Sequence, residues 1–240
     1  MSFFRKFRWR PNLATEETEA ALGDELYVGE CGAERRIMVE RHLWRRGIHD
    51  RRVLAAMTRV PRQRFISARQ RPCAYDDNPL SIGHGQTISQ PYIVARTAEL
   101  AQVEPGSRVL EIGVGCGYQT AVLLELGARV YGIEIIEELA DGARERLARL
   151  GYKNFAIRMG DGFGGWPEVA PFDAITLGAA PVEFPPPLLG QLADGGRLVG
   201  PVGPRHAQLL VRVVRRGTEF SRETICPVRY VPMVGQAEED

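Results

Sequence analysis

Three glycines in the stretch VLEIGVGCGY (109–118) have the spacing of a ligand-binding turn. Gly113, Gly115 and Gly117 follow an apolar run that favours a strand and precede a run that favours a helix. Glycine allows a sharp turn and lets a ligand approach the backbone closely. The dinucleotide fingerprint GxGxxG would place its third glycine at position 118, where this chain has Tyr118. The turn is therefore typical of a nucleotide-type site but departs from the dinucleotide pattern.

Two acidic residues follow the next two apolar runs in order. Glu134 ends RVYGIE (129–134), and an acid at this place can bind both hydroxyls of a ribose. Asp161 lies in GDG (160–162), directly after FAIRM (155–159), where a carboxylate can accept a hydrogen bond from an adenine amino group. Ligands of open α/β sheets bind at the carboxyl ends of the strands, so we expect the three loops to form one site. Taken singly, each acid could instead be a solvated loop carboxylate.

These loops need a sheet to position them, and the second half of the chain has the pattern of one. Strands alternate with helices, which predicts an α/β, Rossmann-like fold: a mainly parallel twisted sheet with helices on both faces and a C-terminal antiparallel hairpin. We expect strands at 107–112, 129–134, 155–159, 172–178, 196–202 and 207–216, and helices at about 118–126, from 135 to 150 and at about 187–192.

The first hundred residues favour helices and one long connection. Helical spacing begins at Ala33 and ends at Gly47, and a second short helix follows with Asp50 as its N-cap. The stretch 64–91 has several Pro and Gly breakers, so we expect it to be largely irregular and, because of its length, functional. Pro91 then stands where the first turn of a helix tolerates proline.

Composition limits the classes of function. The 240 residues are 25% charged and 44% hydrophobic, with a net charge of +1, so no overall field favours nucleic acid or an anionic membrane. The four cysteines form no CxxC and have no metal-ligand spacing, so we expect free thiols and no metal. No apolar run reaches the ~18–20 residues of a membrane span, and the N-terminus lacks a secretory pattern. We therefore expect a cytoplasmic protein.

Seven segments, between about residues 35 and 235, resemble one family in that family's order. They are VPRQRFI, YDDNPLSIGHGQTISQPYIVA, VLEIGVGCGYQTAVL, GDGFGGWP, APFDAI, LLGQLADGGRLVGPVG and VRYVPMVG. Together they resemble bacterial protein-L-isoaspartate O-methyltransferases. GQTISQP (85–91) is the most specific part, since GxGxG alone is typical of any S-adenosylmethionine (SAM) methyltransferase. Cys116, Gly178 and the extension before residue 33 depart from the family's usual pattern.

The resemblance implies a cofactor, a substrate and the residues that bind them. The cofactor is SAM, with contacts from Glu111, Gly113, Gly115, Gly117, Glu134, Asp161 and Gly162. Ser89 is the implied active-site residue, and the implied substrate-binding residues are Gln86, Thr87, Ile88, Val231 and Pro232. The implied reaction methylates the free α-carboxylate of L-isoaspartyl residues in damaged peptides and proteins, and starts their repair through a methyl ester and a succinimide. We expect a monomer without nucleic-acid partners.

The implied reaction makes few chemical demands on side chains. A carboxylate with a pKa of about 3.5 is already ionised at neutral pH, so no general base is needed. Orientation and exclusion of water are then the main contributions of the protein. Ser89 fits as a donor that orients the carboxylate, since no His–Asp pair accompanies it as in a hydrolase. Its alternative role is the N-cap of the helix that begins at Pro91.

The expected domain organisation follows from the same segments. Residues 1–32 form an extension that we expect to be poorly ordered. A single methyltransferase domain covers 33–235, with a helical and substrate-loop region at 33–105 and the SAM-binding sheet core at 106–235, and an acidic tail covers 236–240.

Three other functions remain open at this point. The first is a dedicated modifier of the same family that methylates a fixed Asp of one partner to form a succinimide, with residues 1–32 as a docking arm. The second is an NAD-dependent oxidoreductase, against which the glycine spacing argues. The third is a non-catalytic SAM-binding module.

Overall fold

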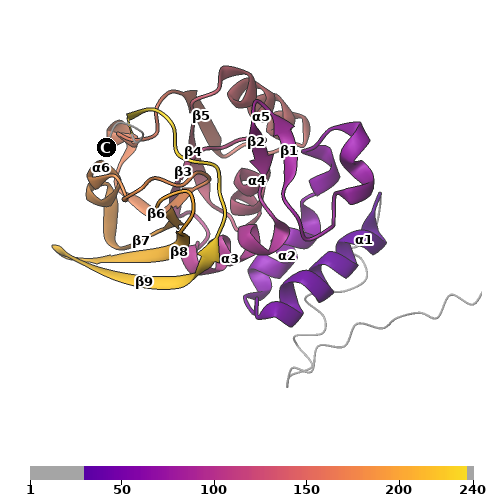
Figure 1. Cartoon of the computed structure of the whole chain (residues 1–240), viewed down its shortest axis with the longest axis horizontal. Coiled ribbons are helices and arrows are strands. Elements are labelled where there is room, and N and C mark those ends of the chain that lie inside the picture. Colours follow the sequence, from indigo (N-terminus) through magenta and orange to yellow (C-terminus); the bar gives the residue numbers. More distant parts are fainter. Residues whose placement is uncertain (1–29, 237–240) are drawn as a thin grey trace, which may run out of the picture.

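The computed structural model describes residues 30–236, in which a helical N-terminal part lies beside a seven-stranded sheet (Figure 1). The expected extension and the acidic tail fall mostly outside the described residues. The first helix is followed directly by a π-helical turn and a 3-10 turn, which end at Gly47 with a φ of 90°. The helices are α1 (Gly32–Ile37), α2 (Arg51–Arg59), α3 (Pro91–Ala101), α4 (Tyr118–Glu125), α5 (Glu137–Arg149) and α6 (Pro186–Gly190).

The sheet confirms the predicted α/β fold. Its strands lie in the order β5-β4-β3-β6-β7-β8-β9; the first five are parallel, and β8 and β9 form an antiparallel hairpin at one edge. The strand order changes direction between β3 and β6, which is where ligands of such sheets bind. The strands are β3 (Arg108–Ile112), β4 (Arg129–Glu134), β5 (Phe155–Met159), β6 (Phe172–Leu177), β7 (Leu192–Val202), β8 (Gln208–Arg216) and β9 (Glu219–Val228).

The prediction that 64–91 is largely irregular was wrong in part. Strands β1 (Leu80–Gly83) and β2 (Gln86–Ile88) form a separate antiparallel hairpin, and a 3-10 segment precedes it. His84 and Gly85 connect the strands with φ values of 52° and 72°. Positive φ at both central residues is the backbone that closes a tight hairpin, and the glycine makes it accessible.

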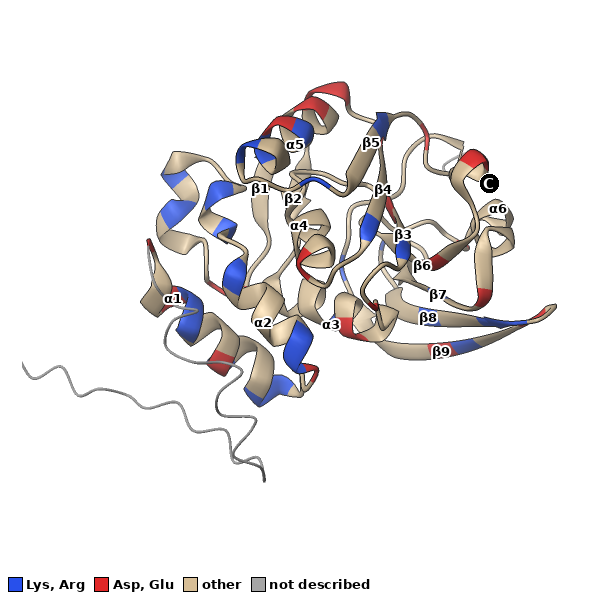
Figure 2. Ribbon diagram, turned by 180° about the vertical axis from the view of Figure 1, so that it is seen from behind, with Lys and Arg blue, Asp and Glu red and all other residues tan. Residues whose placement is uncertain are grey.

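Charged side chains gather on the outer elements of the fold. Figure 2 shows Lys and Arg on α1, α2 and α5 and along the hairpin formed by β8 and β9. Among the described residues, no helix combines the length and the apolar character that crossing a membrane requires. All four cysteines are free thiols, as expected.

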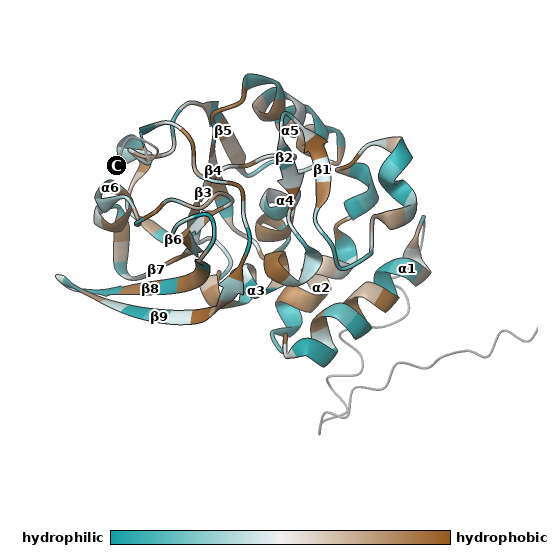
Figure 3. Cartoon of the chain, in the orientation of Figure 1, coloured by the Kyte–Doolittle hydropathy of each residue, from teal (hydrophilic) through white to brown (hydrophobic). Residues whose placement is uncertain are grey.

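Adjacent residues of the central strands point into two cores on opposite faces of the sheet. Val109 packs in one core with residues of α2, α3, α4 and α5, while Leu110 packs in the other with α6 and Met233. This alternation is the period of a strand that is covered on both faces. Figure 3 shows hydrophobic stretches on the inner strands and a hydrophilic tip on the β8–β9 hairpin.

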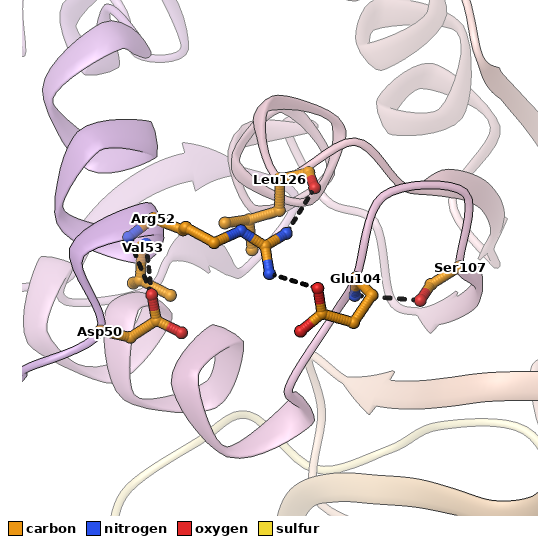
Figure 4. A network of polar contacts seen from close by, with 6 residues as sticks. All are labelled: Asp50, Arg52, Val53, Glu104, Ser107 and Leu126. Atoms are coloured by element: carbon orange, nitrogen blue, oxygen red, sulfur yellow. Dashed lines mark hydrogen bonds and ion pairs between the residues drawn. The ribbon is translucent and has the colours of Figure 1, made fainter. Parts of the chain in front are cut away.

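The N-terminal helices are tied to the sheet layer by polar contacts around α2 (Figure 4). Asp50 is the N-cap of α2, as predicted, and accepts hydrogen bonds from the backbone N–H groups of Arg52 and Val53 at 2.8 and 3.3 Å. Arg52 in turn contacts the Glu104 carboxylate at 2.8 Å and donates to the Leu126 carbonyl at 3.0 Å. Asp50 therefore caps the start of α2, and Arg52 fixes this helix to Glu104, ahead of β3, and to Leu126, at the end of α4.

Candidate active site

The glycine turn after β3 is built from backbone that only glycine adopts readily. Gly113, Gly115 and Gly117 have φ values of 76°, 57° and 86°. The first two line a cavity at the carboxyl ends of the strands, which we call the glycine-walled cavity. Gly117 lies outside that lining: it is the N-cap of α4, and a Cβ there would meet Ala143 at 3.3 Å. Gly117 therefore acts indirectly, because the absence of a side chain lets the start of α4 pack closely against α5.

Glu134 closes the turn from the end of β4. Its carboxylate oxygens accept hydrogen bonds from the N–H groups of Gly115 at 2.7 Å and Ile136 at 3.0 Å. Only 5% of the residue is exposed, and it lines the glycine-walled cavity. The structure therefore brings two predicted site residues into direct contact and leaves an acidic group facing the ligand space.

Glu111 is a second buried carboxyl behind the turn. It accepts hydrogen bonds from Thr120 Oγ1 at 2.6 Å and Gln119 Nε2 at 3.3 Å. It lines a smaller inner cavity, with Ile88, Ser89 and Gly113 among the other walls. Burial raises the pKa of Glu111 to about 8, while the two hydrogen bonds act in the opposite direction. A cation in the inner cavity would therefore favour the ionised form of Glu111 and would pair with its carboxylate.

Asp161 and Gly162 follow β5 but take different positions. Gly162 lines the glycine-walled cavity, and a Cβ there would lie 2.3 Å from Ile112 Cγ2. Asp161 does not line it. Its oxygens accept from the N–H groups of Phe163 and Gln236, both at 2.9 Å. In this structure Asp161 joins the β5 loop to the end of the described chain, and its contact with adenine stays a prediction.

The β1–β2 hairpin brings the most specific motif of the sequence to the same place. Gln86 and Thr87 line the glycine-walled cavity, Ile88 lines the inner cavity, and Ser89 lines the inner cavity and a neighbouring one. Gln90 is the N-cap of α3, and no side chain caps that helix. The alternative of Ser89 as the N-cap is therefore wrong.

The segment that carries this motif is anchored by Asp77. Its carboxylate accepts hydrogen bonds from Gln90 Nε2 at 2.6 Å and from the N–H of Tyr92 at 3.2 Å, and it pairs with Arg46. The Arg46 guanidinium also lies 3.9 Å from the centre of the Tyr92 ring. One carboxylate thus holds together the N-terminal helices, the start of α3 and the residues that precede the hairpin.

The C-terminal segment crosses the carboxyl ends of the strands and completes the walls. The N–H of Ala180 donates to the Val231 carbonyl at 2.9 Å, and the N–H of Met233 donates to the Ala180 carbonyl at 2.8 Å. Pro232 lines the glycine-walled cavity, while Val231 lines the neighbouring cavity of about 380 Å³, which we call the adjoining cavity. Both predicted residues therefore reach the site through backbone pairing with the loop after β6.

Two site residues were missed by the sequence reasoning. Gly178, which we regarded only as a family departure, lines all three cavities, and a Cβ there would lie 2.4 Å from the Gly113 carbonyl oxygen. Its position directly after β6, where loops at the carboxyl ends of strands bind ligands, could have identified it from the sequence. Tyr230 lines the adjoining cavity. Burial raises the pKa of Tyr230, and its interactions with the side chains of Thr97 and Ser89 act in the opposite direction. No spacing in the sequence indicates that Tyr230 and Ser89 lie close together.

The sheet and its loops define a class of protein: the fold is that of SAM-dependent methyltransferases, with the site at the strand ends where that class binds its ligand. A family model described as protein-L-isoaspartate(D-aspartate) O-methyltransferase matches residues 34–238. The chain belongs to this family.

Similar proteins agree with this assignment. The protein-L-isoaspartate O-methyltransferase of Opitutus terrae is 54% identical over 83% of this chain and 86% of its own length. That of Gloeobacter violaceus is 49% identical over 85% of this chain and 100% of its own. Among solved structures, the beta-aspartate methyltransferase (PCMT) from Plasmodium falciparum, in complex with S-adenosyl-L-homocysteine, has a TM-score of 0.73 at 28% identity, over 83% of this chain and 98% of that one.

Proposed function

We propose that this chain transfers the methyl group of SAM to the free α-carboxylate of L-isoaspartyl residues in damaged peptides and proteins. The observation that carries the proposal is a shared wall. Thr87 and Gly178 line both the glycine-walled cavity and the adjoining cavity, so a cofactor in the first and a peptide in the second would meet there. The methyl ester then closes to a succinimide as the backbone amide nitrogen attacks the ester carbonyl and methanol leaves, and hydrolysis of the ring returns a fraction of the molecules to normal aspartate.

The residues present fit SAM as the cofactor. Within residues 30–236, the glycine-walled and inner cavities are lined by the acids Glu134 and Glu111 and by no Lys or Arg. SAM carries a sulfonium and an ammonium group, and both suit such walls better than a pyrophosphate would. Among the alternatives, an NAD-dependent oxidoreductase is therefore disfavoured by charge as well as by glycine spacing. No finding favours a dedicated modifier of one partner.

SAM supplies an electrophilic methyl group on a positively charged sulfur when it is bound. The chain's own residues position the carboxylate that attacks it. The Ser89 hydroxyl, on the wall between the inner and adjoining cavities, donates a hydrogen bond to one carboxylate oxygen and holds the other in line. Opposite charges disappear as the methyl moves, so apolar walls such as Ile82 and Ile88 favour the step by excluding water.

The test uses labelled SAM and two peptides that differ in one linkage, L-isoaspartyl against L-aspartyl. We expect label on the isoaspartyl peptide alone, followed by its loss as the ester closes to succinimide. Equal labelling of both peptides, or of neither, would refute the proposal. A cytoplasmic location and a monomeric state stay predictions of the sequence, and light scattering after gel filtration tests the second.

The role of Ser89 has its own test. Ser89→Ala should lower kcat on the isoaspartyl peptide by roughly tenfold or more, because a lost hydrogen bond to a charged group is worth about 1.5–3 kcal/mol. Ser67→Ala, at an exposed serine outside the cavities, is the matched control and should leave kcat unchanged. Equal rates for Ser89→Ala and the parent chain would remove Ser89 from the mechanism.

A further inference from the structure

A separate surface cavity of about 700 Å³ lies in the N-terminal helical part of the molecule. Its walls come from α1, the end of α2, the turns after α2 and the last turn of α5, and it shares no lining residue with the three cavities of the active site. Figure 2 shows basic residues on these helices. Six of the lining residues are arginines: Arg35, Arg59, Arg64, Arg71, Arg146 and Arg149.

The cavity walls hold far more positive than negative charge. Glu30 is the one acidic residue among those that line it, and its carboxylate pairs with Arg64 at 2.8 Å. The Arg71 guanidinium makes neither an ion pair nor a hydrogen bond with any residue of the described range 30–236, and only the backbone carbonyl of Arg71 accepts a hydrogen bond, from Ala74. Like charges around one cavity repel each other, and among the described residues the lining of this cavity has one carboxylate for six guanidinium groups.

The remaining exposed arginines are only loosely paired. Arg59 and Arg149 reach the carboxylates of Glu125 and Glu145, each at 3.7 Å, and both glutamates lie outside the cavity lining. The Arg149 side chain is 75% exposed, as is its partner. Exposed pairs of this kind contribute little, so these guanidinium groups keep most of their capacity for another anion.

One arginine of the cavity is buried with an unsatisfied donor. Arg35 is 6% exposed, and its Nε–H has no hydrogen-bond partner within the described residues, while its Nη2 donates to the Glu30 carbonyl at 3.2 Å. A buried guanidinium nitrogen without an acceptor is costly. An anion seated in the cavity would bring acceptor oxygens and negative charge to this end of the site.

One of the two cavity arginines on α5, Arg146, is held in place before any ligand arrives. Arg146 donates to the Cys116 carbonyl at 2.7 Å, and Arg149, three residues on, lies on the same face of the helix. Their side chains line the cavity from one wall, while Arg64 and Arg71 line it from the turns after α2. A group that is already fixed, as Arg146 is, loses less freedom when a ligand binds.

We propose that this cavity binds a small anion that carries two or more linked phosphate groups. Guanidinium groups pair with phosphate oxygens in a bidentate manner, and several cations around one hollow match a ligand with several negative charges. The volume lies within the range of small-molecule sites, so a free oligophosphate and a nucleotide both fit in size. The proposal does not depend on the methyl-transfer function.

The test is isothermal titration of the full chain with pyrophosphate, tripolyphosphate and ATP at constant ionic strength. Saturating S-adenosyl-L-homocysteine keeps the cofactor cavity closed to the nucleotide. We expect one site per chain with pyrophosphate, and similar or tighter binding of tripolyphosphate. ATP binding as tightly as tripolyphosphate identifies a site open to nucleotides, and weaker ATP binding identifies a site for the free oligophosphate. Citrate binding as tightly as pyrophosphate would overturn the assignment to phosphate.

Two double variants separate this site from general attraction to a basic protein. Arg71→Glu with Arg149→Glu, both at exposed arginines of the cavity, should weaken pyrophosphate binding at least tenfold. Arg205→Glu with Arg216→Glu makes the same change of net charge at exposed sites outside the cavity and should leave binding within twofold. Equal weakening by both pairs, or no weakening by the first, overturns the proposal. Methylation of the isoaspartyl peptide should stay unchanged in both, which shows that the variants are folded.

Discussion

The two halves of the active site are constructed in different ways. The cofactor half consists of loops after consecutive parallel strands, with glycine backbone and a carboxylate hydrogen-bonded to it. The substrate half joins the β1–β2 hairpin to residues 227–231, which lie far apart in the described chain. The first is positioned by the sheet itself, whereas the hairpin of the second depends on side chains, Asp77 above all, that tie separate segments together.

This difference predicts which kind of substitution impairs each half. In the cofactor half, a substitution acts through steric fit at a fixed backbone. In the substrate half, loss of one anchoring side chain releases a segment that has no ladder to the main sheet. Cofactor binding and peptide turnover should therefore respond to different substitutions.

The strongest test removes the anchor of the substrate half. Asp77→Ala deletes a carboxylate that accepts from Gln90 and Tyr92 and pairs with Arg46, a loss of about 3 kcal/mol for bonds to a charged group. We expect a drop of roughly a hundredfold in kcat/KM for the isoaspartyl peptide, with nearly unchanged affinity for S-adenosyl-L-homocysteine. Asp76→Ala, at the exposed neighbour, is the control. Parallel losses in turnover and cofactor affinity would contradict the division into halves.

The converse test crowds the cofactor half. Gly162→Ala places a Cβ 2.3 Å from Ile112 Cγ2, and overpacking of this kind costs about 2 kcal/mol. We expect affinity for S-adenosyl-L-homocysteine, measured by titration calorimetry, to fall roughly thirtyfold. Gly164→Ala, where nothing lies within 4 Å of the added carbon, should bind normally. If Gly162→Ala bound S-adenosyl-L-homocysteine as tightly as the parent chain, the loop after β5 would be able to move away from Ile112. The cofactor half would then be less rigid than the sheet suggests.

A third test uses the buried carboxyl of Glu111. Its pKa is raised from 4.5 to about 8, so the folded state favours the protonated form. The stabilising contribution is fully present below pH 4.5 and is lost as pH rises toward 8, by at most about 1.4 kcal/mol per pH unit. Without ligand, thermal stability should fall between pH 6 and pH 7, and Glu111→Gln should remove this part of the slope. Glu137→Gln, at an exposed glutamate, should keep it; an unchanged slope in Glu111→Gln would assign the titration to another group.

The smallest expected effect lies outside both halves, at the start of α2. Asp50→Ala removes an N-cap that accepts two backbone hydrogen bonds and should lower the free energy of unfolding by about 1 kcal/mol or less. Asp50→Asn keeps the cap and should be nearly neutral. Urea unfolding measures both. Turnover per folded molecule should not change, and a large loss of activity in Asp50→Ala would show that the N-terminal helices position the site.

The same division explains what could be predicted from the sequence. Five parallel strands, the glycine turn and the contact partner Glu134 follow from local patterns, because each loop comes directly after its own strand. The β1–β2 hairpin was missed because its strands are short and contain few apolar residues. Gly178 and Tyr230 were missed because their roles arise from contacts between distant segments, and no local spacing encodes those.

The hydrogen bonds from Met233 to Ala180 and from Gln236 to Asp161 have a consequence for the order in which the cofactor cavity forms. Ala180 follows β6 and Asp161 follows β5, so residues 231–236 can dock only after these strands of the sheet are in place. Pro232 and Met233 are walls of the glycine-walled cavity, which is therefore incomplete until this segment has docked. A folding intermediate of this protein should therefore have its sheet before it can hold the cofactor.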